Sequence, residues 1–104
     1  MSKPEVLFHK IAMALPNAVE GKLFGALCLK CKTGKTFAIF WKDCMLFKLN
    51  EKAQQDALKL EGSEVGNHLY DPKWPMKGWV SIPYEQSHTW LEFGRCALQN
   101  VKSV

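Results

Sequence analysis

The sequence predicts an α+β fold, in which an antiparallel sheet of a three-strand meander and one later strand carries helices packed on it. The hydrophobic period changes from helical to two at Lys22 and returns to helical near the end of the chain. Strands and helices are grouped and do not alternate as they do in parallel α/β folds. With 104 residues, 47% of them hydrophobic and 23% charged, the chain suits one domain with its own core. We therefore expect the order α-β-β-β-α-β-α over residues 1–104.

The N-terminal segment is expected to form a helix that ends at Pro16. Ser2 and Glu5 have the spacing of a capping box, in which each side chain satisfies an unpaired backbone amide. Asn17 to Gly21 reads as a connector. A strand follows from Lys22 into the CLKC segment, because apolar residues occupy both alternating sets of positions.

Two turns join this strand to two more strands. The first turn, residues 32–35, carries Gly34 where a positive φ is expected, and the second is formed by residues 42–43. The segments TFAIFW, residues 36–41, and CMLFKL, residues 44–49, are rich in residues that favour strands. Together the three strands form an antiparallel meander.

The second half of the chain is expected to hold a short helix, a long loop, a strand and a final helix. Asn50 suits the N-cap of the short helix and Gly62 its C-cap. Residues 63–78 contain two glycines and two prolines and read as a loop, after which residues 79–83 form a strand. Ser87 is the expected N-cap of the final helix. Its apolar stripe is Trp90, Gly94, Ala97, Leu98 and Val101.

Charge and composition narrow the class of protein. The net charge of +4 allows a mild attraction for polyanions, but the single arginine, Arg95, argues against sequence-specific reading of DNA bases. Neither a secretory signal nor a membrane span is recognisable, so we expect a cytoplasmic protein without a membrane partner. The four cysteines are expected to stay reduced in that compartment.

The segment CLKCKTGKTF, residues 28–37, resembles two functional motifs run together. A phosphate-binding P-loop needs an earlier glycine at the position that Leu29 occupies, and needs a helix where this chain has a β-rich run. A zinc site needs a second cysteine pair or suitably spaced histidines. In a straight strand, Cys28 and Cys31 point to opposite faces. The segment therefore reads as a β-hairpin, and neither a metal nor a cofactor is expected.

Five lysines form the first candidate site. Lys30, Lys32 and Lys35 surround the first hairpin, and Lys42 and Lys48 surround the second turn. A basic hairpin can act as a wing on the phosphate backbone of nucleic acid, with little sequence preference. The same lysines also suit the exposed surface and edges of a soluble sheet. No spacing of residues suggests a nucleophile, a base and an orienting group, so no enzyme activity is expected.

A second candidate site is the loop of residues 63–78. His68, Tyr70, Trp74 and Trp79 are the side chains that would bind a small molecule or a metal there. Alternatively, the tryptophans hold the loop against the core. The meander must leave sheet edges, so the chain is expected to be a monomer or a homodimer.

Several short segments carry a resemblance to a known family. They are Phe24-Gly25, Gly34-Lys35 with Phe37-Ala38, Leu46-Phe47-Lys48-Leu49, and Trp79-Val80 with Ile82-Pro83. Through them, roughly residues 7 to 101 resemble the TfoX N-terminal domain family and, more loosely, the MmcQ/YjbR proteins.

The resemblance implies a small α+β domain, here without the second, C-terminal domain of full-length TfoX proteins. TfoX-type proteins are regulators linked to natural competence, and YjbR-like proteins have been likened to double-wing DNA-binding folds. Neither group supplies a catalytic set. The expected function is therefore a non-enzymatic regulatory or interaction module, whose partner is a protein or a nucleic acid.

Overall fold

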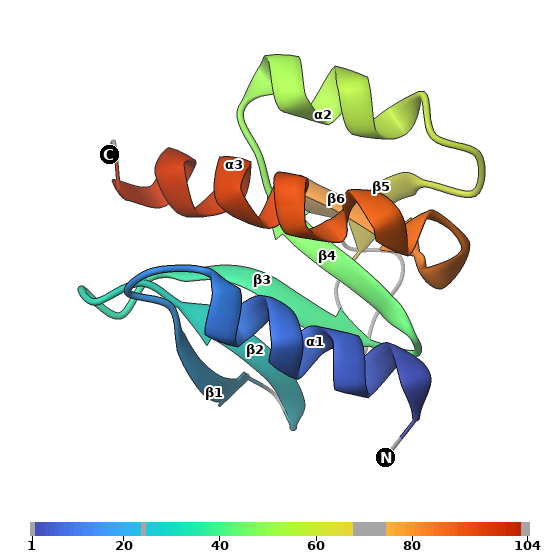
Figure 1. The fold of residues 1–104 in the computed structure, drawn as a ribbon. Helices are drawn as coiled ribbons and strands as arrows, with labels where there is room; N and C mark the ends of the chain where they lie inside the picture. The colour runs from blue at the N-terminus through green and yellow to red at the C-terminus, as the bar shows by residue number, and fades with distance from the viewer. Residues whose placement is uncertain (1, 24, 68–74, 103–104) are drawn as a thin grey trace.

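A computed structural model describes residues 2–23, 25–67 and 75–102. Within these residues the elements are α1 Lys3–Ala14, β1 Val19–Leu23, β2 Ala26–Lys30, β3 Thr36–Trp41, β4 Cys44–Lys48, α2 Glu51–Leu58, β5 Glu64–Asn67, β6 Pro75–Pro83, the 3-10 helix η1 Tyr84–Thr89, and α3 Trp90–Lys102. The six strands form one antiparallel sheet in the order β1-β2-β3-β4-β6-β5 (Figure 1). The predicted α+β class is confirmed, with two strands more than expected.

The sheet buries apolar side chains on both faces. Buried residues of all three helices share the main core with one face of the strands; its largest members include Phe8, Phe37, Phe47 and Trp90. α1 and α3 run across this face (Figure 1). A smaller cluster of Ala26, Cys28, Ile39 and Leu46 covers the opposite face. None of the described helices is long and apolar enough to cross a membrane.

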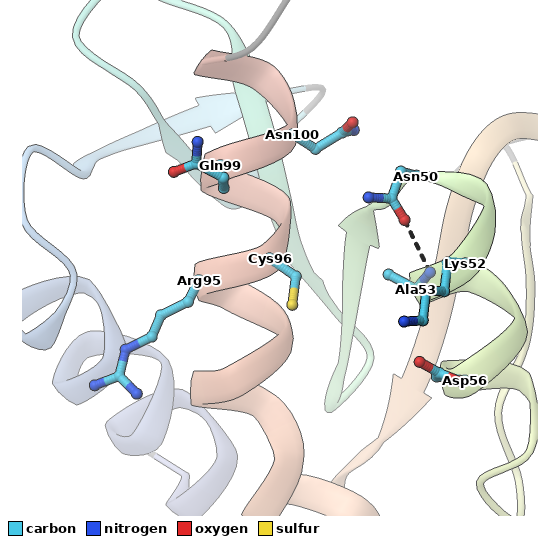
Figure 2. A pocket seen from close by; sticks show the side chains of 8 residues that line it. All are labelled: Asn50, Lys52, Ala53, Asp56, Arg95, Cys96, Gln99 and Asn100. Atoms are coloured by element: carbon cyan, nitrogen blue, oxygen red, sulfur yellow. Dashed lines mark hydrogen bonds between the residues drawn. The ribbon is translucent and has the colours of Figure 1, made fainter.

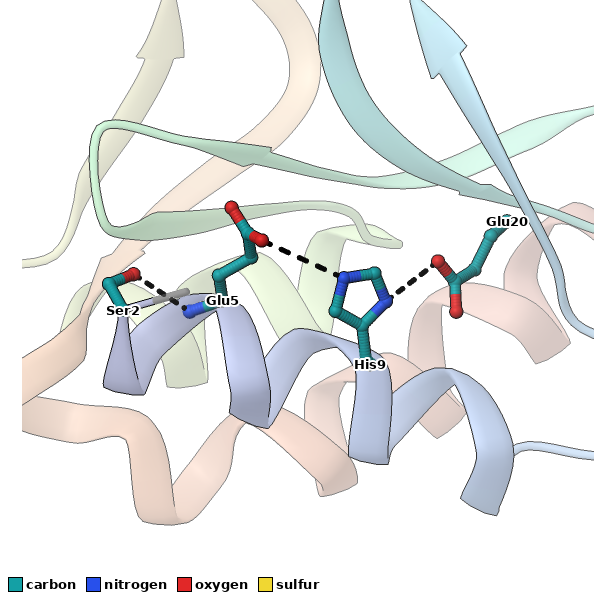
Figure 3. Close-up of polar contacts among 4 residues, drawn as sticks. All are labelled: Ser2, Glu5, His9 and Glu20. Carbon is teal, nitrogen blue, oxygen red and sulfur yellow. Dashed lines mark hydrogen bonds and ion pairs between the residues drawn. The ribbon is translucent and has the colours of Figure 1, made fainter.

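α1 begins and ends as the sequence predicts. The Glu5 N–H donates to Ser2 Oγ at 3.3 Å, which caps the helix, and the helix stops before Pro16. On its outer side, His9 Nδ1 lies 2.8 Å from Glu20 Oε1, and His9 Nε2 lies 3.9 Å from Glu5 Oε2 (Figure 3). The imidazole therefore joins the first helix to the edge strand β1.

The prediction of a single first strand starting at Lys22 is wrong. The chain turns back at Gly25, where φ is 80°, so that β1 pairs antiparallel with β2. Part of the expected connector, Asn17 to Gly21, therefore belongs to β1. The cause is that Gly25 falls in phase with the alternating pattern, so the turn does not interrupt it.

The prediction that residues 63–78 form a loop is also wrong where the structure describes them. They include β5 and the start of β6, which pair with each other. A Cβ at Gly66 would lie only 2.9 Å from Trp79 Cβ, so glycine is what allows the two strands to approach. The Gly78 carbonyl accepts from the Leu49 N–H at 2.8 Å. Gly66 thus serves close strand contact and Gly78 a backbone φ of 89°, although in sequence both look like strand breakers.

The two later helices follow most of their sequence signals. Asn50 Oδ1 accepts from the Ala53 N–H at 2.9 Å and caps α2, which ends before the expected Gly62. Ser87 is not the N-cap of α3, because it lies in η1. The predicted stripe is confirmed, since all five of its residues are buried: Trp90, Gly94, Ala97, Leu98 and Val101.

The β3–β4 turn offers a test of backbone strain. Trp41 pairs with Cys44, so the connection has two residues, Lys42 and Asp43, with φ of 50° and 62°. Lysine is strained there, asparagine and aspartate are tolerated better, and glycine is free of strain, so this turn geometry favours Asn-Gly. We expect the double change Lys42→Asn with Asp43→Gly to raise the free energy of unfolding by about 1 kcal/mol, measured by urea denaturation.

The matched control is Gly34→Ala, which introduces the same strain in the other turn. Gly34 has φ of 92°, and a Cβ there would meet nothing within 4 Å. Its loss of stability, about 1 kcal/mol, would therefore come from the backbone alone. A double variant no more stable than the parent chain would contradict the strain argument.

Candidate functional site

The β2–β3 hairpin projects a short basic turn. The Cys31 N–H donates to the Lys35 carbonyl and the Gly34 N–H donates to the Cys31 carbonyl, both at 2.9 Å. Gly34 takes the left-handed conformation that such a three-residue connection requires. Lys32 and Thr33 are consequently held at an exposed tip with a fixed backbone.

Two adjoining cavities lie between this hairpin and the C-terminal end of α3. The first has a volume of about 300 Å³ and is lined by Asn17, Cys31, Lys32, Thr33, Lys35, Val101 and Lys102. The second has a volume of about 390 Å³ and is lined by Lys35, Thr36, Lys48, Asn100 and Val101. Lys35 and Val101 line both, so the two cavities are direct neighbours.

Four lysines meet at this region, and we call Lys32, Lys35, Lys48 and Lys102 the basic site. The first three were candidates from the sequence. β3 and β4 are antiparallel, and Ala38 pairs with Phe47, which brings the end of β4 to the start of β3. That register places Lys48 beside the first hairpin.

Lys102 was missed in the sequence analysis. The sequence feature that could have pointed to Lys102 is its position next to Val101, at the end of the buried stripe of α3. The sequence does not show which strand the C-terminal end of α3 lies against, because this depends on tertiary packing.

The other two candidate lysines lie elsewhere. Lys30 is on the face of the smaller core cluster, where its Cε would lie 3.3 Å from a Cβ at Gly21. Lys42 is in the turn at the far end of β3, with its Nζ 5.8 Å from the centre of the Trp41 ring. The five lysines therefore do not form one surface.

Lysines are the charged side chains that line the two cavities of the basic site. Among the residues that the structure describes, no aspartate or glutamate lines either cavity, and the sequence has none from Gly21 to Lys42. The C-terminal end of α3 contributes a partial charge of only about −0.5. Four ammonium groups outweigh it, so the cavities attract anions.

Cys31 gives this region its one unusual thiol. It is 4% exposed, and its Sγ lies 3.0 Å from Thr33 Oγ1. The Thr33 hydroxyl, assisted by backbone amides, lowers the pKa of the Cys31 thiol even though burial acts against this. Burial is the main cause that raises the pKa of each of the other three thiols, Cys28, Cys44 and Cys96.

The two cysteines of the CLKC segment do not act as a pair. Cys28 belongs to the smaller core cluster and Cys31 to the main core, so they lie on opposite faces of the sheet, as predicted. Within the described part of the chain, no group of three or more histidine, cysteine or acidic side chains could hold a metal ion.

The loop candidates are only partly covered by the structure. His68, Tyr70 and Trp74 lie outside the described residues, so their role stays a prediction. Trp79 is in β6, half-buried at the margin of the smaller core cluster together with Met76. Its indole is used in packing on that face.

A polar groove between α2 and α3 has no counterpart in the sequence analysis. Its volume is about 630 Å³, and its lining residues are Asn50, Lys52, Ala53, Asp56, Arg95, Cys96, Gln99 and Asn100 (Figure 2). Arg95 extends away from α2, whereas Cys96 faces the groove (Figure 2). Charges of both signs line it, so it lacks the single-sign character of the basic site.

Comparisons with protein-family models, with curated proteins and with solved structures found nothing that matches this chain. The resemblance to the TfoX N-terminal domain family therefore stays a prediction. The chemistry of the basic site rests on the geometry described above.

The Thr33–Cys31 contact predicts a distinct pH dependence of alkylation. Because its pKa is lowered, the Cys31 thiol forms its thiolate at lower pH. The rate at which iodoacetamide alkylates Cys31 should therefore rise at a lower pH than the rate at Cys96. Thr33→Val removes the hydroxyl and should move the Cys31 midpoint to higher pH. Peptide mass spectrometry after timed labelling reads both cysteines in the same sample.

Cys96 is the internal control, because it is exposed and far from Thr33 in the chain. Its midpoint should be the same in both proteins. An unchanged Cys31 midpoint in the Thr33→Val variant would show that the hydroxyl does not stabilise the thiolate.

Proposed function

We propose that this domain is a non-enzymatic interaction module that binds the phosphate backbone of nucleic acid through the basic site. The observation that carries the proposal is the convergence of Lys32, Lys35, Lys48 and Lys102 from three parts of the chain. Such clusters attract polyanions because binding releases the counterions condensed on the nucleic acid.

The chemistry of the site favours backbone contacts over base reading. Lysine is a compact point charge on a flexible stem and carries no planar fork for a guanine edge. Arg95, the one arginine of the chain, lines the α2–α3 groove and neither of the two cavities. We therefore expect salt-sensitive binding with little sequence preference.

A regulatory role of the TfoX N-terminal type agrees with such a module, and we retain it as part of the proposal. We place its action in the cytoplasm, which suits the four free cysteines. Val19 on β1 and Val65 on β5 are each about half exposed on the two edge strands. A homodimer through an edge thus remains an alternative to a monomer.

Salt dependence tests the proposal directly. Fluorescence anisotropy with labelled duplex DNA should show binding that weakens steeply as salt rises. In the double variant Lys32→Ala with Lys48→Ala, the slope of log K against log salt should fall by about two, because two phosphate contacts are lost.

The matched control is Lys42→Ala with Lys59→Ala, which removes the same charge away from the basic site. Lys42 is at the far end of β3, and Lys59 follows α2. Its slope should stay close to that of the parent protein. Equal losses in the two double variants would mean that net charge alone drives binding, and no binding at low salt would refute the proposal.

A further inference from the structure

The basic site is concave, and this points to a ligand smaller than a nucleic acid. A duplex is a convex rod whose phosphates can meet the lysine tips without filling the cavities behind them. The two cavities, of about 300 and 390 Å³, each lie near the lower end of the range of small-molecule sites. One of them extends inward to Cys31, which is almost completely buried.

The lysines are distributed over the two cavities in a way that suits linked anionic groups. Lys32 and Lys102 line the first cavity, Lys48 lines the second, and Lys35 lines both. Because Lys35 lines both cavities, a ligand with several linked phosphates can contact lysines of both. A single phosphate carries less charge and offers fewer oxygen atoms to these lysines.

The second cavity is held in shape by a contact between elements far apart in the sequence. Asn100 Nδ2 donates to the Lys48 carbonyl at 3.2 Å, which ties α3 to the end of β4. The base of Lys48 is thereby fixed relative to the helix that carries Lys102. A site whose backbone is already ordered loses less entropy when a ligand binds.

We infer that the two cavities bind a small oligophosphate, a pyrophosphate or triphosphate group that is free or part of a nucleotide, and that this ligand competes with nucleic acid for the basic site. The competition rests on the proposed function, whereas the oligophosphate binding does not. The ligand would thus regulate nucleic-acid binding by occupying the same lysines.

Inorganic pyrophosphate is the probe for the binding test, with the thiol of Cys31 as its reporter. Iodoacetamide is neutral, so a bound anion does not repel it; the anion slows the reaction by covering the Cys31 thiol and by disfavouring its thiolate. Pyrophosphate should slow this reaction at least five-fold and leave the rate at Cys96 unchanged. Orthophosphate and sulfate at matched ionic strength should protect less, because each offers fewer charged oxygen atoms to the lysines and should bind more weakly.

Isothermal titration calorimetry with pyrophosphate gives a second readout that does not depend on the thiol. Lys48→Gln should weaken binding several-fold, and the control Lys42→Gln should leave it unchanged. Equal protection of Cys31 and Cys96, or no heat of binding at millimolar pyrophosphate, would overturn the inference. Equal binding by the two variants would likewise overturn the assigned site.

A displacement experiment separates this inference from the proposed function. Pyrophosphate added to the complex with labelled duplex, at constant ionic strength, should lower the anisotropy. If pyrophosphate binds and the duplex never does, the proposed function fails while the oligophosphate site stands. If both bind at the same time without displacement, the competition is wrong.

Discussion

The packing of α3 on the centre of the sheet is the constraint on which the rest of the structure depends. Trp90 is completely buried, and its indole Nε1 donates to the Ile82 carbonyl at 3.2 Å. One turn further, a Cβ at Gly94 would lie 3.2 Å from Leu15 Cδ1, so α3 also approaches the end of α1 closely. The helix therefore has little freedom to slide or rotate, because both contacts would be lost.

This packing also creates the basic site. With Trp90 fixed at one end of α3, the other end reaches the hairpin, and Asn100 bonds to the Lys48 carbonyl. Lys102 is carried to the same place. Gathering four like charges costs some stability through mutual repulsion, which surface screening reduces but does not remove. The same charges generate the potential that attracts an anion, so the cost and the binding capacity share one origin.

Local signals were reliable wherever short-range chemistry decides the conformation. Ser2 and Asn50 cap helices because their side chains accept hydrogen bonds from amides three residues ahead, and such contacts need no tertiary partner. Gly34 turns the chain for the same local reason. Local signals failed at Gly25 and Gly66. At Gly25 the alternating apolar pattern continues through the turn, so it does not reveal that the chain reverses. At Gly66 the sequence does not distinguish a glycine that lets two strands approach closely from a glycine that interrupts a strand.

The sequence alone predicts the α+β class, the helix caps, the hairpin turn and the buried stripe of α3, because each of them follows from contacts between residues that are close in the chain. It also shows that CLKC does not place two sulfurs on one face of the sheet. The arrangement of the lysines needed the folded structure. Lys48 joins the hairpin through strand register and Lys102 through helix packing, while Lys30 and Lys42 are carried away by the same geometry. Long-range packing sets these positions, and no local pattern records it.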